Sequence, residues 1–280
     1  MTAGGRSGVV RLVATDLDGT IIRSDGTISA RTSRALAAAE AAGIAVVLVT
    51  GRPPRWMAEV AEAIGHTGLA ICSNGAQLYD LHTEQVVDSR LLSPATLLTV
   101  YSRLSAQIPG LRFAVEYGSG FAHEPGYEHG WTIGGRDIRV DRPEAIMDRP
   151  AAKLLARHPT LDPDELLAAA SALLGAEATV THSSTSALLE ISAPGVTKAS
   201  GLAELAERLG VPAEQAIAFG DMPNDLAMLA WAGRSVAVGN GHPAVLAAAD
   251  EVTASNDDDG VAAVVERLLL DPPAATGPAG

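Results

Sequence analysis

The sequence predicts an α/β fold: a Rossmann-like, doubly wound parallel sheet core with an inserted α+β cap domain. Short apolar strands alternate with helices over residues 9–76 and again from residue 196 onward. This alternation is typical of a parallel sheet with helices on both faces. The residues between these two regions lack it. Apolar residues make up 47% of the chain and aromatic ones only 4%, which suits an aliphatic sheet core.

The first alternating region begins with a β-prone run at residues 9–14. A helix is expected at 28–42, with Ser29 as its N-cap and Gly43 as its stop. An apolar strand at 44–49, a helix at 54–64 and a strand at 69–72 follow. This βαβαβ order predicts parallel strands.

The middle of the chain does not follow this regular alternation of strands and helices. It predicts short strands within 77–87, a helix at 94–107 capped by Ser93, and a hairpin across 113–124. A strand at 153–157, a helix at 162–174 and strands at 179–182 and 187–192 follow. We expect residues 85–191 to form the inserted cap domain, and residues 1–84 and 192–270 to form the core.

The second alternating region completes the core. It predicts helices at 198–209, 225–232, 243–248 and 260–270, and strands at 216–219 and 235–238. Residues 271–280 are rich in Pro, Gly and Ala, and a flexible tail is expected there.

Composition narrows the partners. The formal net charge of −13 disfavours nucleic acid and anionic membranes, since both need basic patches. Cys72 is the only cysteine, so no intrachain disulfide can form. We see no signal-peptide pattern and no run near the roughly 18 apolar residues of a membrane span. A cytoplasmic protein, monomeric or homodimeric, is expected.

Four clusters carry candidate chemistry, each after a predicted strand or at the start of a helix. The first is Asp16-Leu17-Asp18-Gly19-Thr20. One carboxylate can attack phosphorus, and the second can exchange protons with the leaving group and with water. An isolated Asp-x-Asp is more often a strand-end cap, so this interpretation depends on the other clusters.

The second cluster, Thr50-Gly51-Arg52, offers a hydroxyl and backbone N–H groups to phosphoryl oxygens. The third is Lys198, whose charge opposes the helix dipole and therefore indicates an anion binder, although a solvated surface lysine is the alternative. The fourth, Gly220-Asp221-Met222-Pro223-Asn224-Asp225, has oxygen-bearing side chains that suit magnesium, although a structural turn is possible.

In their order and context, the four clusters resemble the haloacid dehalogenase superfamily. Met228-Leu229, Ser73-Asn74-Gly75-Ala76 and the insertion resemble its Cof-type branch with a large α+β cap, subclass IIB. The resemblance spans residues 10–270. Ala199 departs from the pattern, because the branch often has Gly after the lysine.

The resemblance implies a magnesium-dependent phosphohydrolase that acts on small phosphorylated metabolites, such as sugar phosphates, through an aspartyl phosphate. It implies roles for individual residues: catalytic, Asp16 and Asp18; phosphate-binding, Thr50, Gly51, Lys198 and Asn224; metal-binding, Asp16, the backbone carbonyl of Asp18, and Asp221; supporting, Asp225, Arg52 and Asn74. Some residues of the cap are expected to face the site, but the sequence does not say which, and Phe113 and Trp131 are expected in the cap core instead. The candidates are Phe113, Glu116, Tyr117, His123, Glu124, Tyr127, His129, Trp131, Arg136, His158 and His182.

Three alternatives stay open at this point. A phosphomutase or phosphotransferase would use the same aspartyl phosphate. A catalytically silent binding module of the same fold is disfavoured, because both Asp16 and Asp18 are present. A dinucleotide-binding oxidoreductase would need a Gly-rich turn after the first strand, where the Asp16-to-Thr20 cluster stands instead.

Overall fold

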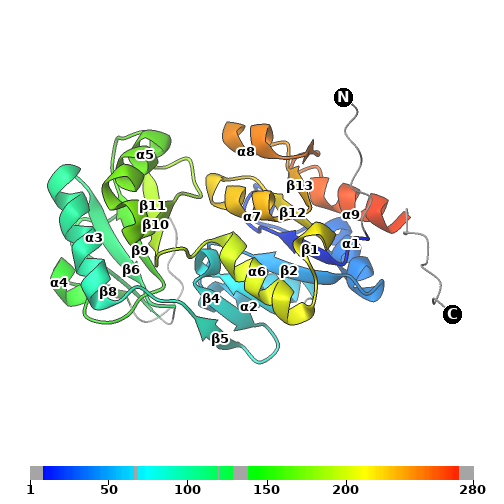
Figure 1. The fold of residues 1–280 in the computed structure, drawn as a ribbon, viewed down its shortest axis with the longest axis horizontal. Coiled ribbons are helices and arrows are strands. Elements are labelled where there is room, and N and C mark those ends of the chain that lie inside the picture. Colours follow the sequence, from blue (N-terminus) through cyan, green and yellow to red (C-terminus); the bar gives the residue numbers. More distant parts are fainter. Residues whose placement is uncertain (1–8, 66–67, 119, 129–137, 271–280) are drawn as a thin grey trace.

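The computed structural model describes residues 9–65, 68–118, 120–128 and 138–270. These residues form a core lobe with an eight-stranded sheet and a cap lobe with a six-stranded sheet. Figure 1 shows the cap, in green, beside the core, with the chain passing between them after β5 and again after β11. Within the described part, none of the helices combines the length and apolarity needed to cross a lipid bilayer.

The core sheet has the strand order β14-β13-β12-β1-β2-β3-β4-β5. Its strands are β1 (Leu12–Thr15), β2 (Ala45–Val49), β3 (Leu69–Cys72), β4 (Gln77–Asp80), β5 (Gln85–Ser89), β12 (Ala216–Gly220), β13 (Arg234–Ala237) and β14 (Glu251–Val252). The strands from β14 to β3 pair in parallel, and β4 and β5 add an antiparallel edge. The chain builds outward from β1 in both directions, so a topological switch point lies between β1 and β12.

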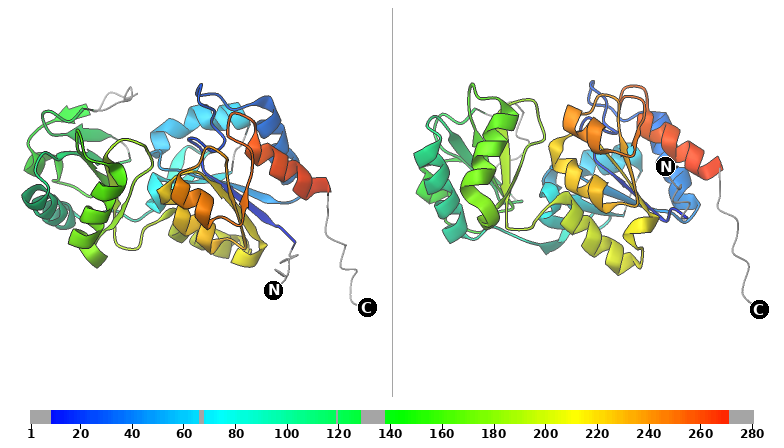
Figure 2. Two further views of the ribbon diagram at one scale, coloured as in Figure 1. Left: turned by 90° about the horizontal axis from the view of Figure 1, so that it is seen from above. Right: turned by 45° about the horizontal axis from the view of Figure 1, so that its top comes forward.

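Helices cover both faces of the core sheet. On one face lie α1 (Ala30–Ala41), α2 (Met57–Ile64) and α9 (Gly260–Leu270); on the other lie α6 (Lys198–Leu209), α7 (Leu226–Trp231) and α8 (Pro243–Ala248). Successive strand residues face opposite sides, so Val13 packs with the first group and Leu12 with the second. Figure 2 shows both layers edge-on. The predicted doubly wound α/β core is confirmed.

The cap sheet has the order β10-β11-β9-β6-β7-β8. Its strands are β6 (Arg112–Glu116), β7 (Phe121–His123), β8 (Ile138–Val140), β9 (Lys153–Arg157), β10 (Thr179–Thr181) and β11 (Leu188–Ser192). One face of this sheet, with Phe113, Leu154 and Leu189, packs against three helices and forms the cap core with them. These helices are α3 (Pro94–Gln107), α4 (Pro143–Ile146) and α5 (Pro163–Leu174). Alternate residues, including Leu155 and Leu188, lie on the other face, which lines the cavity against the core.

The N-cap residues that the sequence predicts for two helices are confirmed. The side chains of Ser29 and Ser93 accept hydrogen bonds from backbone N–H groups three residues on, as N-caps do. The sequence did not indicate β8, α4 and β14, because elements of two to four residues carry too little periodicity. β5 pairs with β4 in the core sheet, whereas residue 85 was expected to begin the cap. We propose that the insertion runs from after Ser89 to Ser192. The predicted tail, residues 271–280, lies outside the described residues.

Candidate active site

Neighbouring core strands end at one edge of the sheet, and each is followed by a predicted site residue. Asp16 follows β1, Thr50 follows β2, and Asp221 follows β12. Backbone hydrogen bonds continue past the strands, from Asp16 N to Phe219 O (3.0 Å) and from Thr50 N to Ile71 O (2.8 Å). Parallel pairing therefore gathers residues that lie far apart in the sequence.

Lys198 lies fully buried between two carboxylates. It is the first residue of α6, and its Nζ donates to Asp16 Oδ1 (2.5 Å) and to Asp225 Oδ1 (2.6 Å). Burial alone would lower the pKa of Lys198, but the attraction of Asp16 and Asp225 outweighs it, and the pKa is raised. Lys198 is thus a buried ammonium, and the alternative of a solvated surface lysine is wrong.

Asp225 already uses both of its oxygens. Oδ1 accepts from Lys198, and Oδ2 accepts from the backbone N–H groups of Asp221 and Met222, both at 3.0 Å. A Cβ at Gly220 would lie 2.5 Å from Asp225 Cβ, so only glycine leaves room there. Asp225 therefore orders the loop after β12 and positions Lys198.

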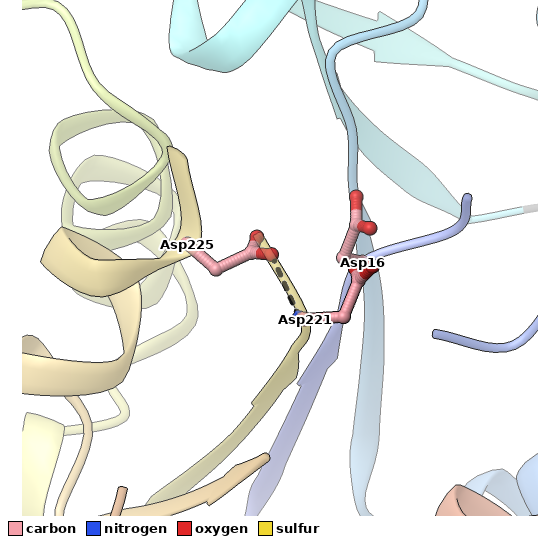
Figure 3. A group of neighbouring side chains, drawn as sticks. All are labelled: Asp16, Asp221 and Asp225. Carbon is pink, nitrogen blue, oxygen red and sulfur yellow. Dashed lines mark hydrogen bonds between the residues drawn. The ribbon is translucent and has the colours of Figure 1, made fainter. Parts of the chain in front are cut away.

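Three carboxylates gather at the switch point. Within the described ranges, Asp16, Asp221 and Asp225 offer oxygens that all lie within 4.8 Å of one another. Figure 3 shows Asp16 at the end of β1, Asp221 and Asp225 on the loop after β12, and the hydrogen bond that joins those two. Asp221 Oδ1 also accepts from Thr20 Oγ1 at 2.9 Å.

The electrostatics of this cluster fit a divalent cation. Burial, and then repulsion from Asp225, raise the pKa of Asp221 to about 7. Burial also raises the pKa of Asp16 well above its usual value, despite the opposing effect of Lys198. The buried negative charge thus exceeds what one ammonium offsets. Carboxylate oxygens are the ligands that magnesium prefers, so the donor set fits that ion.

Asp18 is turned away from this cluster toward Arg52. Its side chain is 56% exposed, and its Oδ2 and Oδ1 accept from Arg52 Nε (2.8 Å) and Nη2 (2.5 Å). This hydrogen bond is the main cause that raises the pKa of Arg52. The side chain of Asp18 lines the cavity while it is paired with Arg52, and its predicted backbone contact with metal stays a prediction.

A cavity of about 350 Å³ lies over the site, between core and cap. Of the predicted residues, Asp16, Asp18, Gly51, Arg52 and Asn224 line it. Thr50, Asn74, Lys198, Asp221 and Asp225 are buried beside them. From the cap come Glu116, Phe121, Lys153, Leu155, Arg157, Ser183, Ser184, Ser186, Leu188 and Glu190.

Among the cap residues expected at the site, Glu116 lines the cavity and forms an ion pair with Arg55 of the core. Phe113 belongs to the cap core, as expected, because it lies on the face of β6 opposite Glu116. His129, Trp131 and Arg136 lie outside the described residues.

Among the cavity residues that the sequence did not indicate are two charged cap residues, Lys153 and Glu190. Lys153 Nζ donates to the backbone oxygen of Gly51 (2.7 Å) and to Glu190 Oε1 (2.8 Å), and Glu190 Oε2 accepts from Asn74 Nδ2 (2.8 Å). Glu190 is the one charged residue in the apolar strand β11, and Lys153 begins the apolar strand β9. A charged residue in a buried, apolar strand is the signal that could have revealed them.

Comparisons with known proteins agree with this geometry. The family model described as haloacid dehalogenase-like hydrolase matches residues 13–265. The Bacillus subtilis (strain 168) 5-amino-6-(5-phospho-D-ribitylamino)uracil phosphatase YcsE is 29% identical over 254 residues, covering 88% of this chain and 91% of that protein. YitU, a phosphatase of the same description and organism, is 30% identical over 259 residues, covering 88% and 92%. The fold also matches the solved subclass IIB sugar phosphatase BT4131 with a TM-score of 0.79 at 21% identity, covering 93% and 99% of the two chains.

Proposed function

The chain belongs to the haloacid dehalogenase-like hydrolases, in the Cof-type branch, and is a phosphatase of phosphorylated small molecules; on this premise we propose that it is a magnesium-dependent phosphomonoesterase that transfers the phosphoryl group first to Asp16 and then to water. The observation that carries the proposal is the buried contact of Asp16 with Lys198, 2.5 Å long, beside a cavity of about 350 Å³.

Asp16 is the nucleophile. One oxygen of its carboxylate attacks phosphorus, the bond from phosphorus to the ester oxygen breaks, and that oxygen takes a proton from Asp18. Lys198 offsets the negative charge of the carboxylate and of the approaching phosphate, and Asp225 keeps the Lys198 ammonium in place. Phosphorus is then bound to Asp16 as an acyl phosphate.

In the second step, water attacks phosphorus and gives a proton to Asp18, and the bond from phosphorus to Asp16 breaks. The position of Asp18 supports this role, because its carboxylate lines the same cavity as Asp16, where Arg52 donates to both of its oxygens and orients it. To act as the acid in the first step, Asp18 must carry a proton and release Arg52. The guanidinium of Arg52, also on the cavity wall, is then free to contact the phosphate.

Magnesium would be held by Asp16, Asp221 and the backbone carbonyl of Asp18. When bound, the ion would offset the charge shared by these carboxylates and the phosphate. The raised pKa values of Asp16 and Asp221 support this assignment, because they result from burial and from repulsion among the carboxylates that Lys198 only partly offsets.

The cavity supports a small substrate. Its volume is at the lower end of the range found for small-molecule pockets, roughly 300–1,000 Å³. The cap wall combines apolar side chains, Phe121, Leu155 and Leu188, with hydroxyl and charged groups. A sugar phosphate or a related metabolite ester fits that mixture, and 5-amino-6-(5-phospho-D-ribitylamino)uracil, named for the two Bacillus relatives, belongs in the first panel.

The test is a screen of phosphorylated metabolites that measures released phosphate, with MgCl₂ and with EDTA. We expect release with magnesium and loss of release with EDTA. Asp16→Asn is the matched control, since it keeps the shape of the side chain and removes the nucleophile. Release that survives chelation, or that Asp16→Asn retains, would contradict the proposal. Release without an acceptor also distinguishes hydrolysis from phosphoryl transfer to a second metabolite.

A further inference from the structure

Four buried polar side chains form a hydrogen-bonded chain from the cap into the active site. Lys153 Nζ donates to Glu190 Oε1 (2.8 Å), Asn74 Nδ2 donates to Glu190 Oε2 (2.8 Å), and Asn224 Nδ2 donates to Asn74 Oδ1 (3.1 Å). Each of the four residues is at most 7% exposed. Lys153 and Glu190 come from β9 and β11 of the cap, and the two asparagines come from the core.

The chemistry of Lys153 and Glu190 sets the donor-to-acceptor direction of all the hydrogen bonds in this series. An ammonium only donates and an ionised carboxylate only accepts. Burial would raise the pKa of Glu190, but the Lys153 charge and hydrogen bonds from Lys153, Asn74 and Ser183 lower it, so the group is ionised. Asn74 must therefore turn its NH₂ toward Glu190, because the reverse orientation would place two oxygens in contact. Its Oδ1 is then left to accept from Asn224.

This direction decides which end of Asn224 meets a ligand. Asn224 lines the cavity, but its Oδ1 is sealed from solvent and has no hydrogen-bond partner. The amide can therefore be reached from the cavity only at Nδ2, which has a second N–H besides the one given to Asn74. An N–H donor suits a phosphate oxygen, and a carbonyl oxygen at the same place would repel it.

We propose that Glu190 is a positioning residue for phosphate binding, which acts from the cap through Asn74 to present the N–H of Asn224 to the cavity. This inference rests on the proposed function, because it assigns Asn224 to the phosphate subsite. It also links the two lobes. Glu190 meets Asn74 only while the cap lies against the core, so the Asn224 donor is oriented in the closed form.

The discriminating variant is Glu190→Gln. It keeps the shape of the side chain at position 190 and reverses the donor-to-acceptor direction of the hydrogen bonds that lead to Asn224. Lys153 still only donates, so the new amide must turn its oxygen to Lys153 and its NH₂ to Asn74. Asn74 and then Asn224 must reverse. We expect the Kd for inorganic phosphate, measured by calorimetry with MgCl₂, to rise about tenfold or more. Loss of the Glu190 charge by itself would favour phosphate and lower the Kd, so electrostatics alone predicts the opposite sign.

A second substitution restores the direction. In the double variant Asn74→Asp, Glu190→Gln, the carboxylate introduced by Asn74→Asp accepts from both neighbours, and Asn224 returns to its original orientation. We expect the double variant to bind phosphate more tightly than Glu190→Gln, although it carries one more negative charge. Glu177→Gln is the matched control, because it makes the same change at an exposed cap ion pair with Arg103; its Kd should equal that of the wild type.

A wild-type Kd in Glu190→Gln, or a double variant that binds no better than the single one, overturns the inference. If Glu190→Gln does not fold, as judged by thermal unfolding, the double variant is compared with Asn74→Asp. That single variant sets two carboxylates against each other, and the double variant must bind phosphate more tightly. Since calorimetry needs no turnover, a failed screen for phosphatase activity would leave this result readable.

Discussion

Gly19 connects the turn after Asp18 with Asp221, a proposed metal ligand, and substitution by alanine tests that contact. Gly19 has φ +77°, and a Cβ built on it would lie 2.3 Å from Asp221 Oδ2 and 3.0 Å from Asp221 Cγ. A carbon and an oxygen in ordinary contact lie about 3.3 Å apart or more. The carboxylate must therefore move by roughly 1 Å, away from the position that its hydrogen bond from Thr20 defines.

Two costs follow from Gly19→Ala, and they are separable. The left-handed backbone costs a side chain about 1–2 kcal/mol of stability. The displacement of Asp221 should lower the activity, because a misplacement of about 1 Å in an active site can cost on the order of a hundredfold in rate. We expect kcat/KM to fall by about that factor, and the magnesium concentration for half-maximal rate to rise.

Gly26→Ala is the matched control. Gly26 has φ +83°, close to that of Gly19, but a Cβ there meets nothing within 4 Å. Urea unfolding of both variants measures the backbone cost, and released phosphate against MgCl₂ measures the functional one. Similar stability losses with an activity loss in Gly19→Ala alone are expected. Equal activities and equal magnesium titrations in the two variants would refute the reasoning.

Further predictions concern the charged groups of the site. Asp16→Asn should retain the thermal stability of a folded protein and lose turnover of a generic aryl phosphate; wild-type hydrolysis would count against it. Asp221→Ala should shift the magnesium titration of activity to higher concentration, and an unchanged curve would argue otherwise. Without metal, the raised pKa of Asp221 favours the folded state fully below its usual value of 3.8, and this contribution is lost as pH rises through about 7. Because binding magnesium requires the carboxylate form, the rise in Tm on adding MgCl₂ should be larger at pH 8 than at pH 6; equal rises would contradict this. Lys198→Met leaves Asp16 and Asp225 buried without their cation, and should cost about 3–5 kcal/mol in urea unfolding at pH 8. The cost should become smaller as the pH is lowered, because the raised pKa of Asp16 lets it take up a proton at a higher pH than an ordinary aspartate; a pH-independent loss would contradict the reasoning.

Much of the core could be predicted because its signals are local. The apolar run of β2, the caps at Ser29 and Ser93 and the motifs after the strands all lie within a few residues. Parallel strands then bring Asp16 and Asp221 to one edge, wherever the insertion falls in the sequence. The roles of individual site residues, the cytoplasmic location and the oligomeric state stay predictions.

The contacts between the cap and the core could not be predicted from the sequence. Lys153 and Glu190 belong to strands of ordinary apolar texture, and nothing nearby in the sequence relates them to Asn74 or Gly51. Their meeting depends on the register of β9 with β11, in which Leu155 lies opposite Glu190, and on how the cap docks against the core. Both are products of packing between segments, which a local pattern does not encode.

The sequence by itself determined the sheet architecture and the family, and it predicted the residues proposed to carry the chemistry, because strand periodicity and motif spacing act over short distances along the chain. Only the tertiary structure decided that Lys198 is a buried ammonium held by two carboxylates, that Asp18 faces Arg52, and that the cap contributes a charged pair to the cavity. Burial and hydrogen-bond direction depend on what surrounds a side chain in space, and those neighbours come from distant parts of the chain.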